Sequence, residues 1–249
     1  MKLISLNIWG GKLYEPLMEF ISKTREDTDI FCFQELFFGD RPGKDVNGAR
    51  ANIAKEIEGA LPEFNIYPYL APKESSFIGK RTLSPIGQAI FSRKSLSVTD
   101  KGGFYTHLPV INHSGIFQYI KVINGKDKFI IGNLHGLWLP TGKLDNPERI
   151  KQSEMIINLY NSYGGKMIIC GDFNLRPETE SIAIFDKNFK NLIRDFGIKS
   201  TRSSFYKDAE KYKDFISDYA FVSQDINIMN FKAIDISVSD HLPIMVEFS

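Results

Sequence analysis

The chain has 249 residues, of which 43% are hydrophobic and 24% are charged. This ordinary globular composition excludes the class of disordered proteins, which combine low hydropathy with high charge. Lys and Arg number 31 against 30 Asp and Glu, so net charge does not single out nucleic acid as a partner, although a neutral total is compatible with a local basic rim.

No targeting or membrane segment is evident in the sequence. Asn7 interrupts the apolar stretch of "MKLISLNIWGG" before it reaches the length of a signal-peptide core. No run approaches the roughly 18 uninterrupted apolar residues of a membrane span. Cys32 and Cys170 both lie in apolar runs, where inert buried thiols are typical. We expect a soluble, cytoplasmic protein with no stable membrane association and with a monomer as the expected state.

Eight short apolar runs rich in β-branched and aromatic residues predict strands. The runs are, in chain order, Lys2 to Trp9, Asp29 to Glu35, Gly87 to Arg93, Ile116 to Ile123, Lys128 to Leu134, Lys166 to Asp172, Ser217 to Ser223 and Leu242 to Phe248. The dipeptide Asn124-Gly125 between two of them predicts a hairpin, which makes part of the sheet antiparallel. The predicted sheets are therefore mixed.

Three helices are predicted between these strands. One covers residues 49–61, and a second runs from Asn146 as N-cap, with Pro147 at the first helical position, to about Tyr163. The third, which Gly197 ends, has one apolar stripe formed by Ile182, Phe185, Phe189, Leu192 and Phe196. We find no internal repeat, low-complexity tract or linker, so a single domain spanning residues 1–249 is expected.

Acids, amides and imidazoles stand where the predicted strands begin or end. These residues are Asn7, Gln34 and Glu35, Asn133 and His135, Asp172 and Asn174, and Asp240 with His241. Side chains two residues apart share a face of a strand, which pairs Asn133 with His135 and Asp172 with Asn174. If the strand ends converge, these side chains form one polar cluster.

An oxygen-rich cluster of this kind suits a hard divalent cation. Mg²⁺ takes one or two carboxylates and keeps water for the oxygens of a substrate phosphate. Zinc is disfavoured, because neither Cys lies near a His at a structural zinc spacing. Imidazoles beside the ion can donate to a phosphate or exchange protons with water near neutral pH.

Each residue also has an ordinary structural interpretation. Asp172 and Asn174 are typical of a turn, Glu35 of a strand that reaches solvent, and His107 and His113 of loop or edge positions. We leave the last two histidines outside the predicted site. Repetition of polar residues at the same structural position is what favours a functional cluster.

Six motifs give the chain a family resemblance. "LNIW", "FQE", "GNLHG", "GDFN", "SDYAFVS" and "SDHLP" occur in the order seen in the endonuclease/exonuclease/phosphatase superfamily of metal-dependent phosphoesterases, which the chain resembles over residues 7–241. The resemblance implies an α/β fold, a four-layer αββα sandwich of two mixed sheets flanked by helices, with the site at one edge.

The resemblance also implies a role for each motif residue. Glu35 resembles the principal metal ligand, with Asn7 and Asp240 completing the metal site directly or through water. The implied ion is Mg²⁺, with Mn²⁺ as a possible substitute. Asp172 matches the residue that positions or deprotonates the attacking water, and Asn174 the amide that holds the phosphate or that water.

Three further motif residues are implied to act on the phosphate. His241 resembles the imidazole that stabilises the charged transition state, and Asp218 the carboxylate that orients it. His135 resembles the second phosphate-facing histidine of the deoxyribonuclease and sphingomyelinase branches.

The predicted function is a Mg²⁺-dependent phosphodiesterase whose leading substrate is nucleic acid, cut by a nuclease or an end-processing activity. Four basic residues are expected to ring the site and hold a polyanion: Arg41, Lys80, Arg81 and Arg149. The alternative is a sphingomyelinase-like enzyme of lipid headgroups or a phosphatase of small molecules, and a polar-flanked strand pair expected over Gln224 to Ser237 weighs against the lipid substrate. A third candidate is a binding module without turnover.

Overall fold

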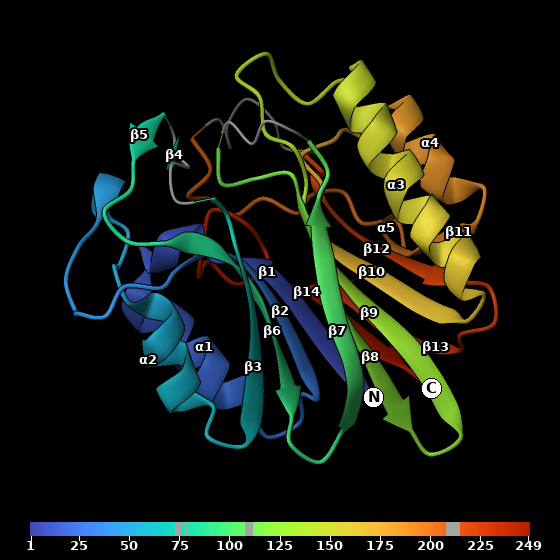
Figure 1. Ribbon diagram of the computed structural model, residues 1–249, viewed down its shortest axis with the longest axis horizontal. Coiled ribbons are helices and arrows are strands. Elements are labelled where there is room, and N and C mark those ends of the chain that lie inside the picture. Colours follow the sequence, from blue (N-terminus) through green and yellow to red (C-terminus); the bar gives the residue numbers. More distant parts are fainter. Residues whose placement is uncertain (73–75, 78, 108–111, 208–214) are drawn as a thin grey trace.

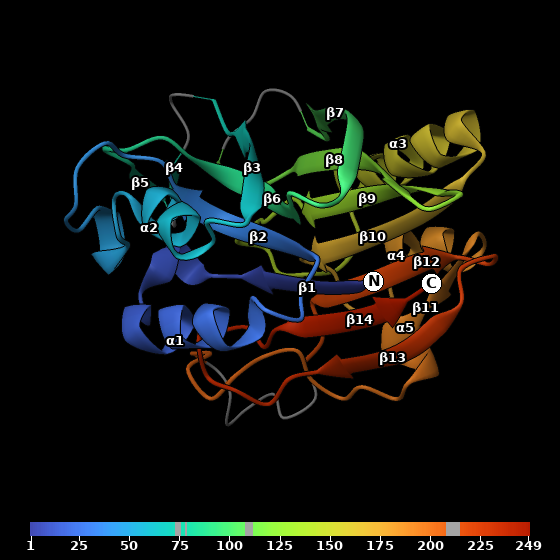
Figure 2. The same cartoon turned by 90° about the horizontal axis from the view of Figure 1, so that it is seen from below.

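Two six-stranded sheets pack face to face, and helices cover the outer face of each (Figure 1). The computed structural model describes residues 1–72, 76–77, 79–107, 112–207 and 215–249. The view turned by 90° shows the same layers end on, with α1 and α2 on one side and α3 and α4 on the other (Figure 2). The predicted four-layer sandwich is confirmed.

Both sheets combine parallel and antiparallel pairs. The first has the order β13 (Ile228–Ala233), β14 (Ile244–Phe248), β1 (Lys2–Asn7), β2 (Ile30–Phe37), β6 (Ile86–Arg93) and β3 (Phe64–Leu70). The second has the order β11 (Phe189–Asn191), β12 (Asp218–Ser223), β10 (Lys166–Asp172), β9 (Asp127–His135), β8 (Ile116–Asn124) and β7 (Ser97–Tyr105). β1 pairs with β2 in parallel, and so does β9 with β10. These parallel central pairs place Asn7 level with Gln34 and His135 level with Asp172, and all of these except Gln34 end their strands.

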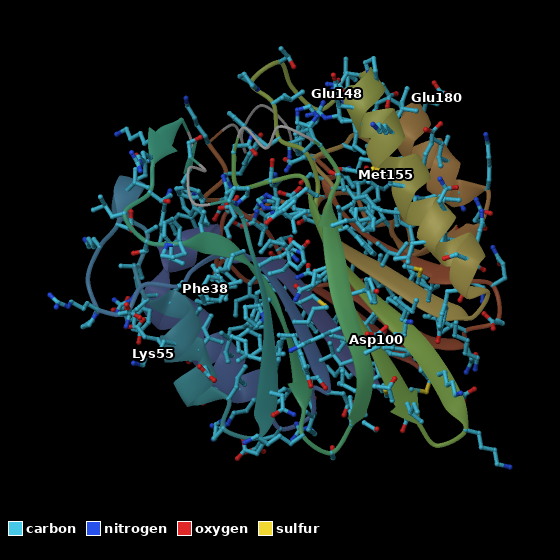
Figure 3. All side chains as sticks on the ribbon, viewed as in Figure 1. Phe38, Lys55, Asp100, Glu148, Met155 and Glu180 are labelled. Atoms are coloured by element: carbon cyan, nitrogen blue, oxygen red, sulfur yellow. The ribbon has the colours of Figure 1, made fainter. Side chains whose placement is uncertain are left out.

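The helices lie on the outside and two small elements lie near the strand ends. The helices are α1 (Tyr14–Thr24), α2 (Ile53–Ala60), α3 (Pro147–Tyr163), α4 (Glu180–Asp186) and the single turn α5 (Leu192–Asp195), and the small hairpin joins β4 (Ser76–Phe77) to β5 (Lys80–Arg81). Figure 3 shows Lys55 on α2 and Glu180 on α4 at the periphery of the molecule, where both are exposed. No helix within the described ranges is long and apolar enough to cross a membrane.

Most predicted elements are present, and those that were missed have a common cause. All eight predicted strands occur, and the Asn124-Gly125 hairpin joins β8 to β9 in antiparallel register. α3 begins as predicted, with the Asn146 side chain accepting a hydrogen bond from Arg149 N. β3 and β7 are half-exposed edge strands that were not predicted: β7 is largely polar, and Pro68 interrupts the otherwise aromatic and apolar β3. Residues 224–237 hold one strand, β13, and the predicted strand pair is wrong.

The predicted helix over residues 182–196 is also wrong. α4 ends at Asp186, and residues 189–191 form β11, which pairs with β12. Asn191 then caps α5 by accepting from Arg194 N. Strand pairing thus overrides a helical stripe that local sequence favours. Four of the five stripe residues still reach the same core, whereas Phe196 is 47% exposed. The helix predicted over residues 49–61 begins at Ile53, because the preceding residues form turns.

Alternation along the central strands divides the core into two layers. Leu3 on β1 packs between the sheets, whereas Ile4 and Leu6 pack toward α1 and α2. The same alternation points Asn7 into the space between the sheets, two residues beyond Ser5. The space between the sheets is therefore filled by apolar side chains along the strands and by buried polar side chains at the strand ends.

Gly171 provides a test of how tightly the strand end is built. Its φ is +138°, and a Cβ there would lie 2.0 Å from the Leu134 carbonyl oxygen. Strain and overpacking predict that Gly171→Ala lowers the free energy of unfolding by at least about 2 kcal/mol in a denaturant titration. Gly59→Ala on α2 is the matched control, since a Cβ at that position meets nothing within 4 Å. This substitution is expected to raise the free energy of unfolding by about 0.5–1 kcal/mol. Equal stabilities for the two variants would contradict the geometry.

Candidate active site

One carboxamide joins the two sheets at their carboxyl edge. Asn7, 1% exposed, donates from Nδ2 to Glu35 Oε1 at 3.0 Å and to Asp172 Oδ2 at 3.2 Å. Its Oδ1 accepts from Trp9 N at 3.0 Å. In this arrangement Asn7 presents its nitrogen to the acids and bridges them. Its predicted part in binding the metal stays a prediction.

Glu35 sits in an irregular part of β2 that directs its side chain toward Asn7. The register with β6 shifts between Phe33 and Leu36, and Glu35 has a φ of +60°. A bulge of this kind re-aims a side chain, and positive φ outside glycine is a strain that structures retain mainly at functional sites. Burial alone would raise the pKa of Glu35, but His113, His135 and the Asn7 amide lower it to about 2. The carboxylate is therefore ionised at neutral pH.

The donor set fits a divalent cation. Glu35 Oε2 is buried and has no hydrogen-bond partner in the part of the chain that the structure describes. An ionised, unpartnered carboxylate oxygen in a buried site is costly unless a cation compensates it. Burial lowers the pKa of Lys12, and the charges of Glu35 and Asp240 both oppose this shift, so both carboxylates lie near that ammonium; the Asp240 side chain is 14% exposed. Glu35 and Asp240 are the residues that would hold such an ion.

Asp172 lies at the end of β10 among positive and polar groups. Asn174 N donates to its Oδ1 at 3.0 Å, and His241 Nε2 lies 3.5 Å from its Oδ2. Lys143 Nζ and Arg202 Nη2 each lie 4.0 Å from one of its oxygens. Burial would raise the pKa of Asp172, but the charges of Lys143, His241 and Arg202 outweigh it and hold that pKa well below the usual range. A carboxylate of such low basicity orients water better than it deprotonates it.

Asn174, two residues after Asp172, is held in place through both its side chain and its backbone N–H. It adopts a φ of +54°, and its Nδ2 donates to the Gly136 carbonyl at 3.0 Å. Its backbone N–H is the donor to Asp172. The remaining amide oxygen is thus held in a defined direction beside Asp172.

His241 and Asp218 form a buried pair. His241 Nδ1 lies 2.8 Å and 2.9 Å from the two carboxylate oxygens of Asp218. Thr201 and Ser217 donate their hydroxyls to Asp218 Oδ2 at 2.7 and 3.1 Å. Burial and Arg202 would lower the pKa of His241, but the nearby acids prevail and raise it. Arg202 Nη1 also contacts His241 Nε2, and because a guanidinium only donates, that nitrogen accepts in this structure and Nδ1 carries the hydrogen toward Asp218.

His135 lies at the end of β9, and its surroundings shift its pKa in the opposite direction to that of His241. Its Nε2 lies 3.7 Å from Glu35 Oε1. Burial and the neighbouring His113 lower the pKa of His135 to about 4, against the pull of Glu35 and Asp172. The surroundings thus shift the two imidazoles in opposite directions: the pKa of His135 is lowered near Glu35, and that of His241 is raised near Asp172.

Gln34 and Asn133, also noted at strand ends, serve a different purpose. Gln34 Nε2 donates to Asn133 Oδ1 at 2.6 Å, and Asn133 Nδ2 donates to the Phe33 carbonyl at 3.2 Å. Gln88 Nε2 donates to the Asn133 carbonyl at 2.8 Å. These fully buried amides fasten one sheet to the other directly beneath the acids.

Sequence reasoning missed three residues of the site: His113, Lys143 and Arg202. The placement of His113 outside the site is wrong, because its Nε2 lies 3.4 Å from Glu35 Oε1. Lys143 and Arg202 come from loops, and no motif or periodicity marks them. Lys143 Nζ and Arg202 Nε are buried without a hydrogen-bond partner among the residues described. Burial and Arg202 lower the pKa of Lys143 to about 8 despite the nearby acids.

The predicted basic rim is partly wrong. Arg149 is 2% exposed and donates to the carbonyls of Leu137, Gly142 and Leu144, so it holds a loop together. Arg41, Lys80 and Arg81 are exposed. Lys80 and Arg81 form β5, and Ser76 on the paired β4 contacts His113 through its carbonyl. The β4–β5 hairpin therefore carries its positive charge next to the site.

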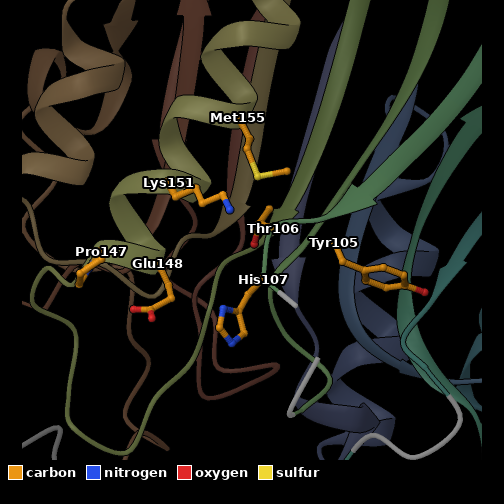
Figure 4. Close-up of a pocket in the computed structure, with 7 residues that line it drawn as sticks. All are labelled: Tyr105, Thr106, His107, Pro147, Glu148, Lys151 and Met155. Carbon is orange, nitrogen blue, oxygen red and sulfur yellow. The ribbon is translucent and has the colours of Figure 1, made fainter. Parts of the chain in front are cut away.

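A pocket of about 350 Å³ lies between the end of β7 and the first turns of α3. Its lining consists of Tyr105, Thr106, His107, Pro147, Glu148, Lys151 and Met155. Figure 4 shows Glu148, Lys151 and Met155 projecting from α3 beside Thr106 and His107. Thr106 N bonds to Gly115 O, and Gly115 N bonds to the His135 carbonyl, so the pocket adjoins the site through backbone contacts.

The sequence profile of the Endonuclease/Exonuclease/phosphatase family matches residues 4–241. The chain belongs to this family and is a phosphoric ester hydrolase. Its members generally depend on a divalent metal, for which the carboxylates and histidines described above provide ligands. A comparison with curated proteins finds no match.

Several solved structures share the fold. A humanized D. rerio TDP2 superposes with a TM-score of 0.74 at 16% identity, covering 100% of this chain and 98% of that one. The mannosyl-6-phosphatase Bt3783 of Bacteroides thetaiotaomicron gives 0.72 at 16% identity, covering 100% and 99%. The human Nocturnin catalytic domain with bound sulfate gives 0.67 at 16% identity, covering 100% and 93%. Likeness at this identity shows the fold alone.

Thr201 offers a test of the buried pair that does not depend on the reaction. Thr201→Val removes a hydroxyl that Asp218 accepts in a fully buried position. Asp218 Oδ2 then has one hydrogen-bond donor fewer, which is expected to lower the free energy of unfolding by about 1–3 kcal/mol. The same loss should raise the pKa of His241 further, and an NMR titration of the imidazole measures this shift. Thr201→Ser keeps the hydroxyl and is the control. An unmoved His241 titration in Thr201→Val would show that the pair does not set the charge of this imidazole.

Proposed function

We propose that this protein is a Mg²⁺-dependent phosphodiesterase that hydrolyses nucleic acid by in-line attack of water, with Mn²⁺ as a possible substitute ion. The observation that carries the proposal is the surroundings of Asp172. Lys143, whose buried ammonium lacks a partner in the described chain, lies within 4.0 Å of this ionised acid, and so does His241. Donors held beside Asp172 in this way can bind a substrate's phosphoryl oxygens, on which charge develops in the transition state.

Each residue then takes a defined part. Asp172 orients the attacking water, and the amide oxygen of Asn174 accepts a hydrogen bond from it. His241, oriented by Asp218, faces the phosphoryl oxygens, and Lys143 and Arg202 neutralise the remaining charge. His135 contributes a neutral N–H or lone pair on the Glu35 side.

The metal would be held by Glu35 and Asp240, with Asn7 keeping Glu35 and Asp172 in register. When bound, Mg²⁺ would supply charge stabilisation to the phosphate and to the departing oxygen. Oxygen ligands with one or two carboxylates are the ligand set that Mg²⁺ prefers.

Nucleic acid is supported as substrate by the surface beside the site. The β4–β5 hairpin exposes Lys80 and Arg81. Trp138, three residues after His135, has 37% of its surface exposed. Exposed basic groups together with an exposed aromatic ring are the elements that hold a phosphate backbone and stack on a base.

A phosphatase acting on small phosphorylated molecules is the second candidate. The pocket beside His135 has about 350 Å³, the size of a small-molecule site, and one structural neighbour is a mannosyl-6-phosphatase. Lipid headgroups belong to the same predicted alternative. The binding module without turnover is the third candidate, and it is disfavoured because every polar motif position is filled. The cytoplasmic location, the monomeric state and the single domain stay predictions.

Two substitutions test the assignment of the reaction. Asp172→Asn and His241→Ala are each expected to fold and to keep at most about a hundredth of the wild-type turnover, as loss of one fixed transition-state contact costs about 10² to 10³ in rate. Chelation with EDTA should abolish turnover, and Mg²⁺ should restore it. His107→Ala, which removes an imidazole of the neighbouring pocket, is the control. Near-normal turnover in either site variant would refute the assignment.

A substrate panel separates the candidates. With Mg²⁺ and Asp172→Asn as the blank, we expect the highest kcat/KM on DNA or RNA, including 5′-tyrosyl and abasic-site oligonucleotides, and a steep loss of affinity with salt. Preference for sugar phosphates would favour the second candidate, and preference for sphingomyelin or phosphoinositide vesicles would favour the lipid-headgroup form of that alternative. Absence of hydrolysis on every substrate would support the binding module.

The pH profile tests Lys143. Its pKa is lowered to about 8, so the ammonium is present below that pH and is lost above it. We expect kcat/KM of the wild type to fall as pH rises through about 8, because a neutral amine attracts phosphate weakly. Lys143→Arg should move this alkaline limb to higher pH, since guanidinium stays protonated. An alkaline limb at the same pH in both proteins would exclude Lys143 as its origin.

A further inference from the structure

A second group of potential ligands lies on the far side of Glu35 from Asp172. It consists of Glu35 from β2, His113 from the loop before β8 and His135 from the end of β9, and one ligating atom of each lies within 4.8 Å of the others. The two imidazoles are 5% and 2% exposed, and their ring centroids are 5.1 Å apart. The proposed hydrolysis gives His113 no part, so this convergence needs a separate explanation.

The orientation of His113 is fixed by a backbone carbonyl. Its Nδ1 lies 2.9 Å from Ser76 O. A carbonyl oxygen can only accept, so Nδ1 carries the hydrogen, and in the neutral ring Nε2 presents a lone pair. That lone pair faces Glu35 Oε1, which is also an acceptor, at 3.4 Å. Two facing acceptors repel unless positive charge lies between them, as a proton on Nε2 or as a bound cation.

The distances suit a metal ion better than a proton. Charge-assisted N–H···O bonds are about 2.7–2.9 Å long, whereas Nε2 of His113 and of His135 lie 3.4 and 3.7 Å from the same oxygen. Two ligands bound to one ion at about 2.0–2.2 Å lie about 3.0–3.5 Å apart at octahedral or tetrahedral angles; the His113 distance falls in this range, and the His135 distance is slightly longer. Glu35 Oε2, unpartnered within the described residues, leaves the carboxylate able to use either oxygen.

We propose that Glu35, His113 and His135 form a two-histidine, one-carboxylate site for a first-row transition-metal dication of the Mn²⁺, Co²⁺ and Zn²⁺ class. Imidazole nitrogen favours these ions over Mg²⁺. A histidine ligand usually donates its other nitrogen to a carbonyl or carboxylate, and the Ser76 carbonyl supplies this contact for His113. The site deepens the proposed function because it shares Glu35 with the oxygen site for Mg²⁺, so occupation of one changes the charge felt by the other.

Pulsed EPR of bound Mn²⁺ tests the proposal without turnover. Mn²⁺ is added at one equivalent to the full-length protein in excess Mg²⁺, which occupies the oxygen site without an EPR signal. The wild type is expected to show nitrogen-14 couplings from two imidazoles. His113→Ala should lose one coupling and bind Mn²⁺ and Co²⁺ about 10- to 100-fold more weakly by calorimetry. His107→Ala removes an imidazole that does not belong to this group, so its nitrogen couplings and metal affinity should match those of the wild type.

The readout separates failure of this site from failure of the hydrolytic proposal. Nitrogen couplings absent from the folded wild type would overturn the site, even if Mg²⁺-dependent hydrolysis that requires Asp172 is found. Couplings present without hydrolysis of any substrate would leave the site standing and remove the proposed function. If thermal unfolding shows that His113→Ala does not fold, the spectrum of His135→Asn is compared with that of the wild type. Loss of one nitrogen coupling supports the site, and an unchanged spectrum overturns it.

Discussion

The structure depends on one buried amide that bonds to acids from both sheets. Asn7 Nδ2 donates to Glu35 in the first sheet and to Asp172 in the second. Two ionised carboxylates that share a buried donor repel each other, so the arrangement needs positive charge nearby. The protein supplies Lys143, Arg202 and His241 on the Asp172 side. On the Glu35 side lie imidazoles and a carboxylate oxygen that has no hydrogen-bond partner among the described residues. This imbalance is the physical reason for expecting a cation at Glu35 and a phosphate near Asp172.

The rest of the fold keeps this edge rigid. Gln34 and Asn133 join the sheets immediately below the acids through fully buried hydrogen bonds. Ser239 on the approach to β14 donates to the Asn7 carbonyl at 2.7 Å, which ties the loop of Asp240 and His241 to β1. A polar network that is satisfied in this way specifies one register between sheets, since a one-residue slip would leave its members buried and unpaired. The strained φ values of Glu35 and Asn174 are held within that frame.

Regular strands and motifs led to the predicted site residues, whereas loop residues outside any motif were missed. Asn174, Asp240 and His241 lie outside the regular strands and were predicted only because they belong to motifs. Asn7, His135 and Asp172 end strands whose apolar alternation is plain, so their convergence followed from the carboxyl ends of parallel pairs. His113, Lys143 and Arg202 reach the site from irregular segments, where no periodicity fixes direction. Arg149 was placed on the rim because it is charged, but three backbone carbonyls hold it inside. The break after α4 was missed because pairing of β11 with β12 is a long-range interaction.

The most direct measurement is a crystal structure of Asp172→Asn with Mn²⁺ and a short oligonucleotide, with the ion located by its anomalous scattering. The account predicts an ion bound to Glu35 and a phosphodiester between that ion, Lys143 and His241, with Asn7 still bonded to Glu35. An ion bound away from Glu35, or a phosphate that contacts neither Lys143 nor His241, would contradict it.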